Sequence, residues 1–301
     1  MKVNVIIPTF KPDSVFEELM EKLQTQTLQP EKIIIMNTEE KYWGERKLFP
    51  NTEVHHLSVG EFDHGATRTE GVLKGDGDIF ICMTQDAMPA DRFLIENLVK
   101  ALTADETIAA AYARQMAGEN SSEIEKFTRV FNYPEESSIK GKEQLNTLGI
   151  KTYFCSNVCA AYKRDLFLEL GGFVKHTIFN EDMLFAAKAV QAGKRIAYAA
   201  DARVYHSHDY TSRQQFHRNF DNGVSQADHP EIFEGISSES EGMRLVKQTV
   251  AHLWKKGKPG LILKFCVDCA AKYAGFFLGK HYRRLPKKMV TACSMNRHYW
   301  E

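Results

Sequence analysis

Short apolar runs alternate along the first 200 residues with longer segments in which apolar residues recur every three or four positions. The short runs are typical of buried strands, and the periodic segments are typical of amphipathic helices. We predict strands over 3–8, 32–36, 53–58, 78–83, 108–114, 195–199 and 203–206, and helices over 14–26, 67–74, 90–102, 163–170 and 180–192. This alternation predicts an α/β fold with a mostly parallel sheet flanked by helices.

The remaining segments carry no clear strand pattern. Residues 119–147 are polar and predict a loop or a partly helical excursion. Further helices are expected over 212–222, 239–256 and 261–281. We therefore expect a catalytic domain over 1–235 and a helical extension over 236–301.

Charge is divided unevenly between the two parts, although the formal net charge of the 301 residues is zero. Residues 241–301 contain 13 Lys+Arg and 3 Asp+Glu, a net charge of +10. The first 240 residues contain 26 basic and 36 acidic residues, a net charge of −10. A basic tail on an acidic body predicts an anionic partner for the tail.

The last long helix is apolar apart from Lys264, Asp268 and Lys272, which are spaced four apart. On a helix these charges share one stripe, so the segment is expected to lie in a membrane interface or a protein groove rather than to span a bilayer. Association with a membrane and packing on the body or on a second copy both remain open. Only a short apolar run precedes Pro8, and the six cysteines form no regular framework, so we expect a cytosolic chain.

Candidate chemistry follows the predicted strands, because parallel sheets bind ligands at the carboxyl ends of their strands. No Gly-rich dinucleotide or P-loop motif follows the first strand. Gly65 and Arg68 open a helix, which is either a phosphate site or an ordinary turn. Asp86 follows a buried strand, either as a ligand for a divalent ion or as a turn residue.

Two further groups of polar residues stand out. Glu181 and Asp182 begin a helix, where acids are also favoured as caps. His206 and His208 are two apart at a strand end, which suits a metal or phosphate site but also fits polar surface.

Taken in order, these segments resemble the nucleotide-diphospho-sugar glycosyltransferases of family 2, which have the GT-A fold. The run comprises Val5-Ile-Ile-Pro-Thr-Phe10, Gly65 to Arg68, Gln85-Asp86-Ala87, Gly171-Gly-Phe173, Asn180-Glu-Asp182 and His206/His208. The narrower similarity is to bacterial rhamnosyltransferases of cell-surface polysaccharide synthesis, through Phe62-Asp-His-Gly-Ala-Thr-Arg68 and Thr84-Gln-Asp-Ala-Met-Pro89. The tail residues Arg284-Leu-Pro286, Ser294-Met295 and Tyr299-Trp300 also resemble theirs.

The resemblance implies inverting transfer of a sugar, most simply L-rhamnose from dTDP-L-rhamnose, to a lipid-linked saccharide at the inner face of a bacterial plasma membrane. Asp182 would be the general base. The donor would be bound by Thr9, Asn37, Arg68, Gln85 and Asp86, and the acceptor side would hold Glu181, Gln215 and Arg218. Asp86 and His206, or His208 in its place, would bind Mg²⁺ or Mn²⁺. A homodimer is possible, and no nucleic-acid partner is expected.

Two departures from the family pattern weaken parts of this assignment. Thr84 replaces the first acid of the usual acid-x-acid pair, which leaves only the Asp86 carboxylate to bind a metal there. Asn37 stands where the family often has Asp. A UDP-hexose donor, a non-catalytic sugar-nucleotide-binding protein and a nucleotidyltransferase are the alternatives. Asp182 favours catalysis, and the segment Pro8-Thr-Phe-Lys-Pro12 lacks the Gly-rich basic loop of nucleotidyltransferases.

Overall fold

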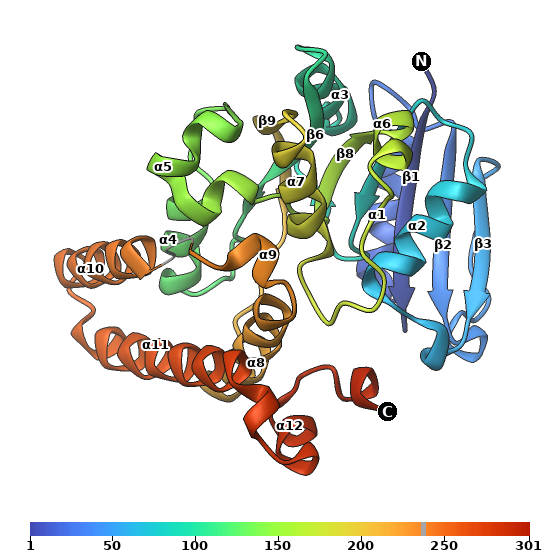
Figure 1. The fold of residues 1–301 in the computed structure, drawn as a ribbon. Helices are drawn as coiled ribbons and strands as arrows, with labels where there is room; N and C mark the ends of the chain where they lie inside the picture. Colours follow the sequence, from blue (N-terminus) through green and yellow to red (C-terminus); the bar gives the residue numbers. More distant parts are fainter. Residues whose placement is uncertain (236–238) are drawn as a thin grey trace. The chain divides into compact units, whose positions relative to one another are not determined.

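The computed structural model describes residues 1–235 and 239–301, which form two compact units (Figure 1). The first unit comprises residues 1–116, 133–176 and 181–206, and the second comprises 117–132, 177–180 and 207–301. The predicted border at 235/236 falls on residue 236, which lies outside the described residues, so that border stays a prediction.

The first unit is built on a sheet with the strand order β3-β2-β1-β4-β8-β6-β9-β5, in which β7 also pairs with β9. The strands are β1 (Val3–Phe10), β2 (Lys32–Thr38), β3 (Thr52–Leu57), β4 (Ile79–Met83), β5 (Met88–Pro89), β6 (Ile108–Met116), β7 (Ser138–Lys140), β8 (Cys159–Lys163) and β9 (Arg195–Tyr205). Its helices are α1 (Ser14–Gln24), α2 (His64–Lys74), α3 (Leu94–Thr103), α5 (Leu145–Leu148), α6 (Arg164–Glu169) and α7 (Glu181–Gln191). The predicted α/β arrangement is confirmed.

The sheet is mixed, because β8 runs antiparallel to both of its neighbours, β4 and β6. The strands β1, β2, β3 and β4 run parallel, and so do β6 and β9. We did not predict β8, whose sequence Cys-Ala-Ala-Tyr-Lys has only one residue that favours strands. It forms a strand because it pairs with β4 and β6 on its two sides, and not because of its own propensity.

Two predicted strands near residue 200 form one strand, β9. The pairing of β9 with β6 jumps from Ala113↔Ala199 to Arg114↔Arg203, so three residues bulge out between the two halves. A bulge of this kind bends a strand without ending it. The two predicted segments were therefore correct in position but belong to one element.

Helix α1 shows how the sequence specifies the layers over the sheet. Its buried residues Phe16, Leu19, Met20 and Leu23 recur at helical spacing and join the core under β1 and β2. The Asp13 side chain accepts hydrogen bonds from the backbone N–H groups of Val15 and Phe16, which caps the helix. Burying one such apolar face contributes on the order of 1.5–3 kcal/mol per large side chain.

The second unit is helical. It contains α4 (Glu123–Asn132), α8 (Ser212–Asp228), α9 (Pro230–Phe233), α10 (Glu239–Lys255), α11 (Pro259–Lys280) and α12 (Lys287–Cys293). The three helices predicted beyond residue 210 are confirmed, and the predicted polar excursion contains α4. Within the described residues we find no helix with the length and apolar character that crossing a bilayer requires.

Candidate active site

The predicted site residues of the first unit lie at one edge of the sheet. Thr9 is near the end of β1, Asn37 is near the end of β2, Asp86 follows β4 and His206 follows β9. Because β8 is antiparallel to both β4 and β6, the carboxyl ends of the parallel strands on its two sides point the same way. The sheet topology therefore brings these residues to a common edge, as predicted.

Thr9 and Asn37 contact each other at the ends of β1 and β2. The Thr9 hydroxyl donates to Asn37 Oδ1 at 3.0 Å, and both residues are buried. Asn37 Nδ2 lies 3.2 Å from the Glu39 carbonyl and 3.0 Å from Nδ1 of His56. The amide is thus held on both sides, and His56 is a neighbour that sequence reasoning did not identify.

Gln85 ties the turn after β4 to the end of β1. Its Oε1 accepts from the backbone N–H of Phe10 at 2.8 Å, and its Nε2 donates to the Phe10 carbonyl at 3.2 Å. The predicted binding of the donor by Gln85 stays a prediction. In the structure, the Gln85 side chain positions the turn that carries Asp86.

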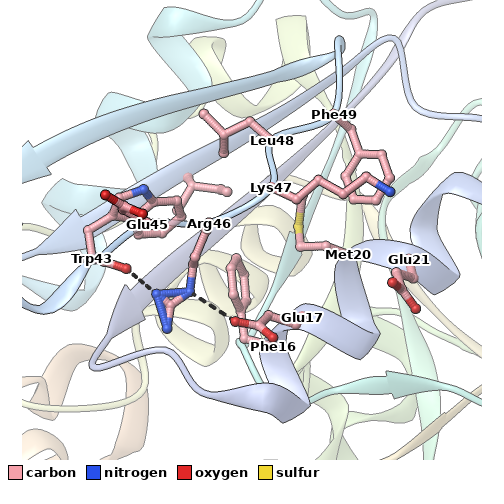
Figure 2. Close-up of a pocket in the computed structure, with 11 residues that line it drawn as sticks. Phe16, Glu17, Met20, Glu21, Trp43, Glu45, Arg46, Lys47, Leu48 and Phe49 are labelled. Atoms are coloured by element: carbon pink, nitrogen blue, oxygen red, sulfur yellow. Dashed lines mark hydrogen bonds and ion pairs between the residues drawn. The ribbon is translucent and has the colours of Figure 1, made fainter.

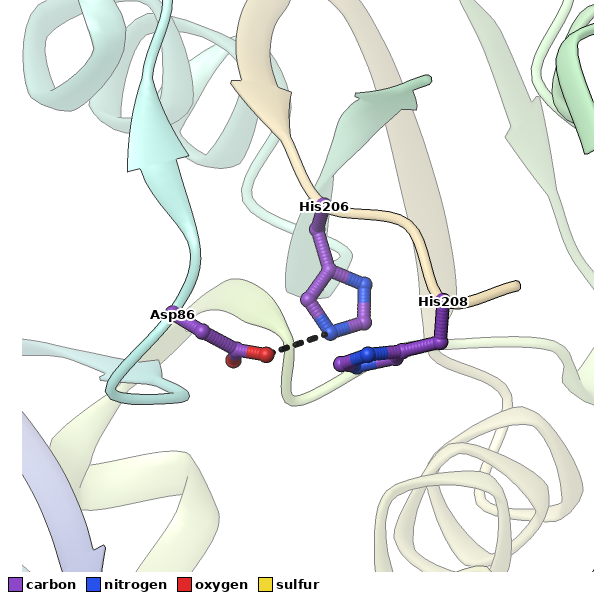
Figure 3. A group of neighbouring side chains, drawn as sticks. All are labelled: Asp86, His206 and His208. Atoms are coloured by element: carbon purple, nitrogen blue, oxygen red, sulfur yellow. Dashed lines mark ion pairs between the residues drawn. The ribbon is translucent and has the colours of Figure 1, made fainter. Parts of the chain in front are cut away.

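Asp86 and His206 face each other across the edge of the sheet (Figure 3). His206 Nε2 lies 3.6 Å from a carboxylate oxygen of Asp86. On the other side of the ring, His206 Nδ1 lies 3.3 Å from Oε1 of Gln115, whose Nε2 donates to the Ser156 hydroxyl at 2.9 Å. Because the amide oxygen of Gln115 can only accept, it favours the tautomer with the proton on Nδ1. In that tautomer the lone pair of Nε2 points toward Asp86.

This pair of residues suits a divalent ion. A carboxylate oxygen and an imidazole nitrogen are common metal ligands, and the two ligand atoms lie within 4.8 Å of each other. An Asp/His group of this kind could bind a metal. His208 follows His206 by two residues and belongs to the second unit, so the choice between the two histidines stays a prediction.

Arg68 lies on α2 and forms an ion pair with Glu181 at the start of α7. Arg68 Nη1 is 3.1 Å from Glu181 Oε1 and donates to the His64 carbonyl at 2.9 Å. The two residues are only 5% and 6% exposed. Arg68 therefore has a buried carboxylate as its partner here, and its expected contact with a diphosphate stays a prediction.

The turn before Arg68 is explained by packing and capping. A Cβ on Gly65 would lie 2.0 Å from the Val174 carbonyl, so this position requires glycine for close backbone approach. The Asp63 side chain accepts from the N–H groups of Gly65 and Ala66 at 3.0 and 2.6 Å. These two N–H groups therefore have a side-chain partner, and the phosphate-site interpretation of this turn stays a prediction.

Asp182, the predicted general base, is held by two backbone donors. Its Oδ2 accepts from the N–H of Asn157 at 2.8 Å, and its Oδ1 accepts from the N–H of Met183 at 2.7 Å. The Asn157 side chain donates to Glu181 Oε1 at 3.0 Å, so one residue fixes both acids. The next residue, Val158, accepts from the N–H of Thr84, which links this segment to the turn that carries Asp86.

The two acids have opposite electrostatic environments. Burial and the neighbouring Glu181 carboxylate raise the pKa of Asp182 to about 7. Burial also disfavours the charged form of Glu181, but Arg68, His64 and the Asn157 amide outweigh it and hold the pKa of Glu181 below its usual range. Two adjacent acids whose pKa values are driven apart are typical of a general base beside a permanently charged partner.

The two acceptor-side residues of α8 belong to the second unit. The Arg218 guanidinium lies over the Phe179 ring at 4.6 Å and over the Tyr210 ring at 5.6 Å from their centroids. The Gln215 carbonyl accepts from the side chain of Asn219 one helical turn later. Their acceptor-side role, and that of Glu181, stays a prediction.

A cavity of about 240 Å³ lies between α1 and the loop that follows β2 (Figure 2). Phe16 and Met20 line it from α1, and Trp43 and Arg46 line it from the loop. Arg46 donates to the backbone carbonyls of Trp43 and Pro12. None of the predicted site residues lines this cavity, so it carries no part of the candidate chemistry.

Sequence reasoning missed Asn157 and Gln115. Gln115 is the penultimate residue of β6, which we predicted to end at Arg114. A predicted strand two residues longer would have identified it by the strand-end rule. Asn157 precedes the unpredicted strand β8, and no signal in its own segment marks it.

Comparison with known proteins finds a matching family model and relatives that are similar along the full chain. Residues 4–171 match Glycosyl transferase family 2. The chain is 39% identical over 308 residues to the O-antigen chain rhamnosyltransferase RfbN of Salmonella typhimurium, covering 100% of this chain and 96% of the relative. It is 37% identical to the O-antigen chain rhamnosyltransferase WbaN of Salmonella anatum, covering 99% and 95%.

Solved structures with a similar fold bind sugar nucleotides. The mannosyltransferase PcManGT from Pyrobaculum calidifontis, in complex with GDP-Man and Mn²⁺, superposes with a TM-score of 0.56 at 16% identity, over 99% of this chain and 84% of that chain. S. aureus TarS 1–349, in complex with UDP-GlcNAc, gives a TM-score of 0.54 at 17% identity, over 98% and 84%. At these identities the similarity establishes the fold, which is GT-A.

Proposed function

The chain belongs to glycosyl transferase family 2, and we propose that within this family it transfers L-rhamnose from dTDP-L-rhamnose to a lipid-linked saccharide. It is a glycosyltransferase by its family and by its relatives. The observation that carries the choice of sugar is the 39% identity, along the full chain, to an O-antigen chain rhamnosyltransferase. The product would be a growing bacterial surface polysaccharide.

The proposed reaction is an inverting single displacement. The acceptor hydroxyl attacks the anomeric carbon of the donor, the bond from that carbon to the diphosphate oxygen breaks, and the nucleoside diphosphate leaves. Asp182 takes the proton of the attacking hydroxyl. A carboxylate with a pKa of about 7 suits this task, because it is ionised in a useful fraction at neutral pH and is still basic enough to accept the proton.

The remaining residues would hold the reactants. Thr9 and Asn37 would line the nucleoside pocket, and Arg68 and Gln85 would bind the donor or position the groups that bind it. Asp86 and His206 would hold Mg²⁺ or Mn²⁺. A bound ion would stabilise the charge that develops on the leaving diphosphate. The pair fits such an ion because Gln115 already orients Nε2 of His206 toward the Asp86 carboxylate.

The nature of the acceptor suggests where the enzyme works. A saccharide carried on a lipid diphosphate stays at a membrane surface, so we propose that the chain acts as a peripheral protein on the inner face of the plasma membrane. The net charge of +10 over residues 241–301 supports attraction to anionic lipid.

The experiment that tests the proposed function is a donor panel. The purified chain is incubated with dTDP-L-rhamnose, UDP-glucose, UDP-galactose and UDP-N-acetylglucosamine, with and without a lipid-saccharide extract, and release of nucleoside diphosphate is measured. We expect release from dTDP-L-rhamnose, stimulated by the extract and abolished in Asp182→Asn. Release from a UDP-hexose and not from dTDP-L-rhamnose would show that the donor is the UDP-hexose. Equal binding of the donors without any release would favour a non-catalytic sugar-nucleotide-binding protein.

A further inference from the structure

Helix α11 turns its one acidic residue inward. Asp268 is only 6% exposed, and it accepts from the Ser212 hydroxyl of α8 at 2.5 Å and from Lys264 Nζ at 2.8 Å. The charges Lys264, Asp268 and Lys272 do share one stripe, as their spacing predicts. Asp268, the middle residue of that stripe, lies on the side of the helix that packs against α8, whereas the Lys264 side chain is 54% exposed.

Two glycines fix this orientation. A Cβ on Gly275 would lie 2.2 Å from the Phe216 carbonyl, and a Cβ on Gly279 would lie 2.1 Å from the Phe220 carbonyl. Both glycines are on the same side of α11 as Asp268, because they follow it at helical spacings of seven and eleven residues. The backbones of α8 and α11 therefore approach closely, and α11 cannot rotate without breaking this contact.

The opposite side of α11 is apolar and open to solvent. Leu263, Val267, Ala270, Ala274 and Phe277 recur at intervals of four and three residues and lie on one face, here called the α11 stripe. Leu263, Val267 and Phe277 are 72%, 51% and 50% exposed. No charged residue lies on this stripe between its ends. Its large side chains are not among the described residues that pack around Phe220 and Val224.

Exposed aromatic residues lie on both α10 and α11. Tyr273 is 69% exposed and stacks on the Phe277 ring with centroids 6.3 Å apart. On α10, Trp254 is 72% exposed and lines a shallow hollow together with Val250, Lys247 and Lys255. Tyrosine and tryptophan beside lysine are typical of the interface between lipid headgroups and acyl chains.

Basic residues stand at both ends of α11. Lys255, Lys256 and Lys258 precede it, Lys280 is its last residue, and Arg283, Arg284, Lys287 and Lys288 follow it. Some of them also have acidic neighbours, since Lys256 and Lys258 lie near Glu123 and Arg283 pairs with Asp228. The tail nevertheless keeps its excess of positive charge, which complements an anionic surface.

We propose that the α11 stripe is the surface through which this protein inserts into the headgroup region of an anionic lipid bilayer. The proposal rests on the proposed function, which places the acceptor on a lipid, and it names the residues that bring the enzyme to that lipid. A second copy of the chain is a poorer occupant of the stripe. Because both ends of α11 are basic, a parallel or an antiparallel pair of these helices would bring like charges together.

The test is flotation of the full chain with vesicles of phosphatidylcholine, alone or mixed with phosphatidylglycerol. We expect the wild-type chain to float with the anionic vesicles and not with phosphatidylcholine alone. Val267→Glu and Phe277→Glu should each lower the partition coefficient by about tenfold or more. Each substitution removes an apolar side chain that would move from water into the bilayer, and puts a charged side chain in its place. Leu73→Glu is the matched control, since Leu73 is 59% exposed on α2 and should leave binding unchanged.

A second readout keeps the native stripe almost intact. Cys266 is exposed beside the stripe, and an environment-sensitive fluorophore attached there, with Cys269→Ser and Cys293→Ser, should shift to the blue on anionic vesicles. Deletion of the whole tail is a poorer test, because removing α11 uncovers Gly223, whose Cα faces the α11 backbone.

The outcomes separate this inference from the proposed function, because donor hydrolysis without lipid is measured on every variant. Normal hydrolysis with no flotation, or flotation that the two substitutions leave unchanged, would overturn the inference and leave the glycosyltransferase function standing. Sedimentation showing a wild-type dimer that the substitutions dissociate would assign the stripe to a second copy instead. Flotation without release from any donor would keep the inference and overturn the function.

Discussion

Arg68 and Glu181 form an ion pair with an N–O distance of 3.1 Å, and each side chain is less than 10% exposed. A buried pair of this kind is costly to desolvate and costly to break, and breaking one typically costs about 3–5 kcal/mol. Its position next to Asp182 gives it a use beyond stability. It keeps a negative charge at Glu181, and that charge is one of the two causes that raise the pKa of Asp182.

The first prediction concerns this charge. In Glu181→Gln the amide can still accept from Arg68, but the negative charge beside Asp182 is gone, so the pKa of Asp182 should fall. The rising limb of the pH–rate profile, which we expect near pH 7 in the wild-type enzyme, should move to lower pH. The measurement is kcat against pH with saturating donor and acceptor.

Asp165→Asn serves as the control for that profile, because Asp165 is an acid in the first turn of α6 rather than of α7. A rising limb that stays near pH 7 in Glu181→Gln would mean that Glu181 does not set the pKa of the base.

The second prediction gives Asp182→Asn opposite effects on rate and on stability. Loss of a general base typically lowers the rate about 10²–10⁴-fold, while donor affinity should stay within a few-fold. The folded-state pKa of Asp182, about 7, lies above its ordinary value of 3.8. The folded protein therefore holds a proton that the unfolded chain releases, and the stability contributed by this carboxyl falls as pH rises through about 7.

Above pH 7 the ionised Asp182 should destabilise the wild-type fold, so Asp182→Asn should raise the free energy of unfolding there by about 1–2 kcal/mol. Near pH 4 or below, both chains carry a neutral group and the difference should vanish. Urea unfolding at pH 8 and at pH 4 measures this. A variant that is less stable at pH 8 would show that the ionised carboxylate is not strained in the fold.

The third prediction concerns the proposed metal site. Asp86→Ala should remove any stimulation of donor hydrolysis by Mn²⁺ or Mg²⁺. Gln115→Leu removes the acceptor at His206 Nδ1, so the tautomer is no longer selected, and metal affinity should fall about 10–100-fold. Titration of Mn²⁺ by its paramagnetic effect on water relaxation measures binding without relying on activity. Wild-type hydrolysis that is indifferent to EDTA would make Asp86 a turn residue or a direct donor contact.

The sequence predicted the positions of this chemistry better than the contacts that organise it. The alternation of apolar runs and periodic segments located Thr9, Asn37, Asp86 and Asp182 at strand ends or at a helix start, because the covalent order of elements determines where parallel strands end. It could not show that Arg68 turns toward Glu181. That choice depends on the approach of α2 to α7, which the strand and helix pattern does not contain.

The strand and helix pattern also lacks the contacts that determine β8 and the orientation of α11. β8 is a strand because β4 and β6 offer it hydrogen-bonding partners on both sides, and its own residues carry little of that signal. On α11 the three charges share one stripe, as their spacing predicts. The burial of Asp268 was not available from the pattern, because an amphipathic helix normally turns its charges outward, and here Ser212 and the glycines of the α8–α11 contact hold Asp268 inward.

The last prediction tests that contact. In Gly279→Ala the new methyl group would lie 2.1 Å from the Phe220 carbonyl and 3.0 Å from the Gly223 Cα, both of which are backbone atoms that cannot rotate away. The two helices would have to separate, which we expect to lower the free energy of unfolding by about 1–3 kcal/mol.

Gly242→Ala is its matched control on α10. A Cβ there would meet no atom within 4 Å, and replacing glycine within a helix by alanine should stabilise the chain by about 0.5–1 kcal/mol. Urea unfolding followed by circular dichroism compares the two variants with the wild-type chain. Opposite signs at the two glycines would show that close approach, and not helix propensity, is what position 279 requires. A stabilising Gly279→Ala would mean that α8 and α11 lie further apart than the structure places them, and the inward orientation of Asp268 would lose its explanation.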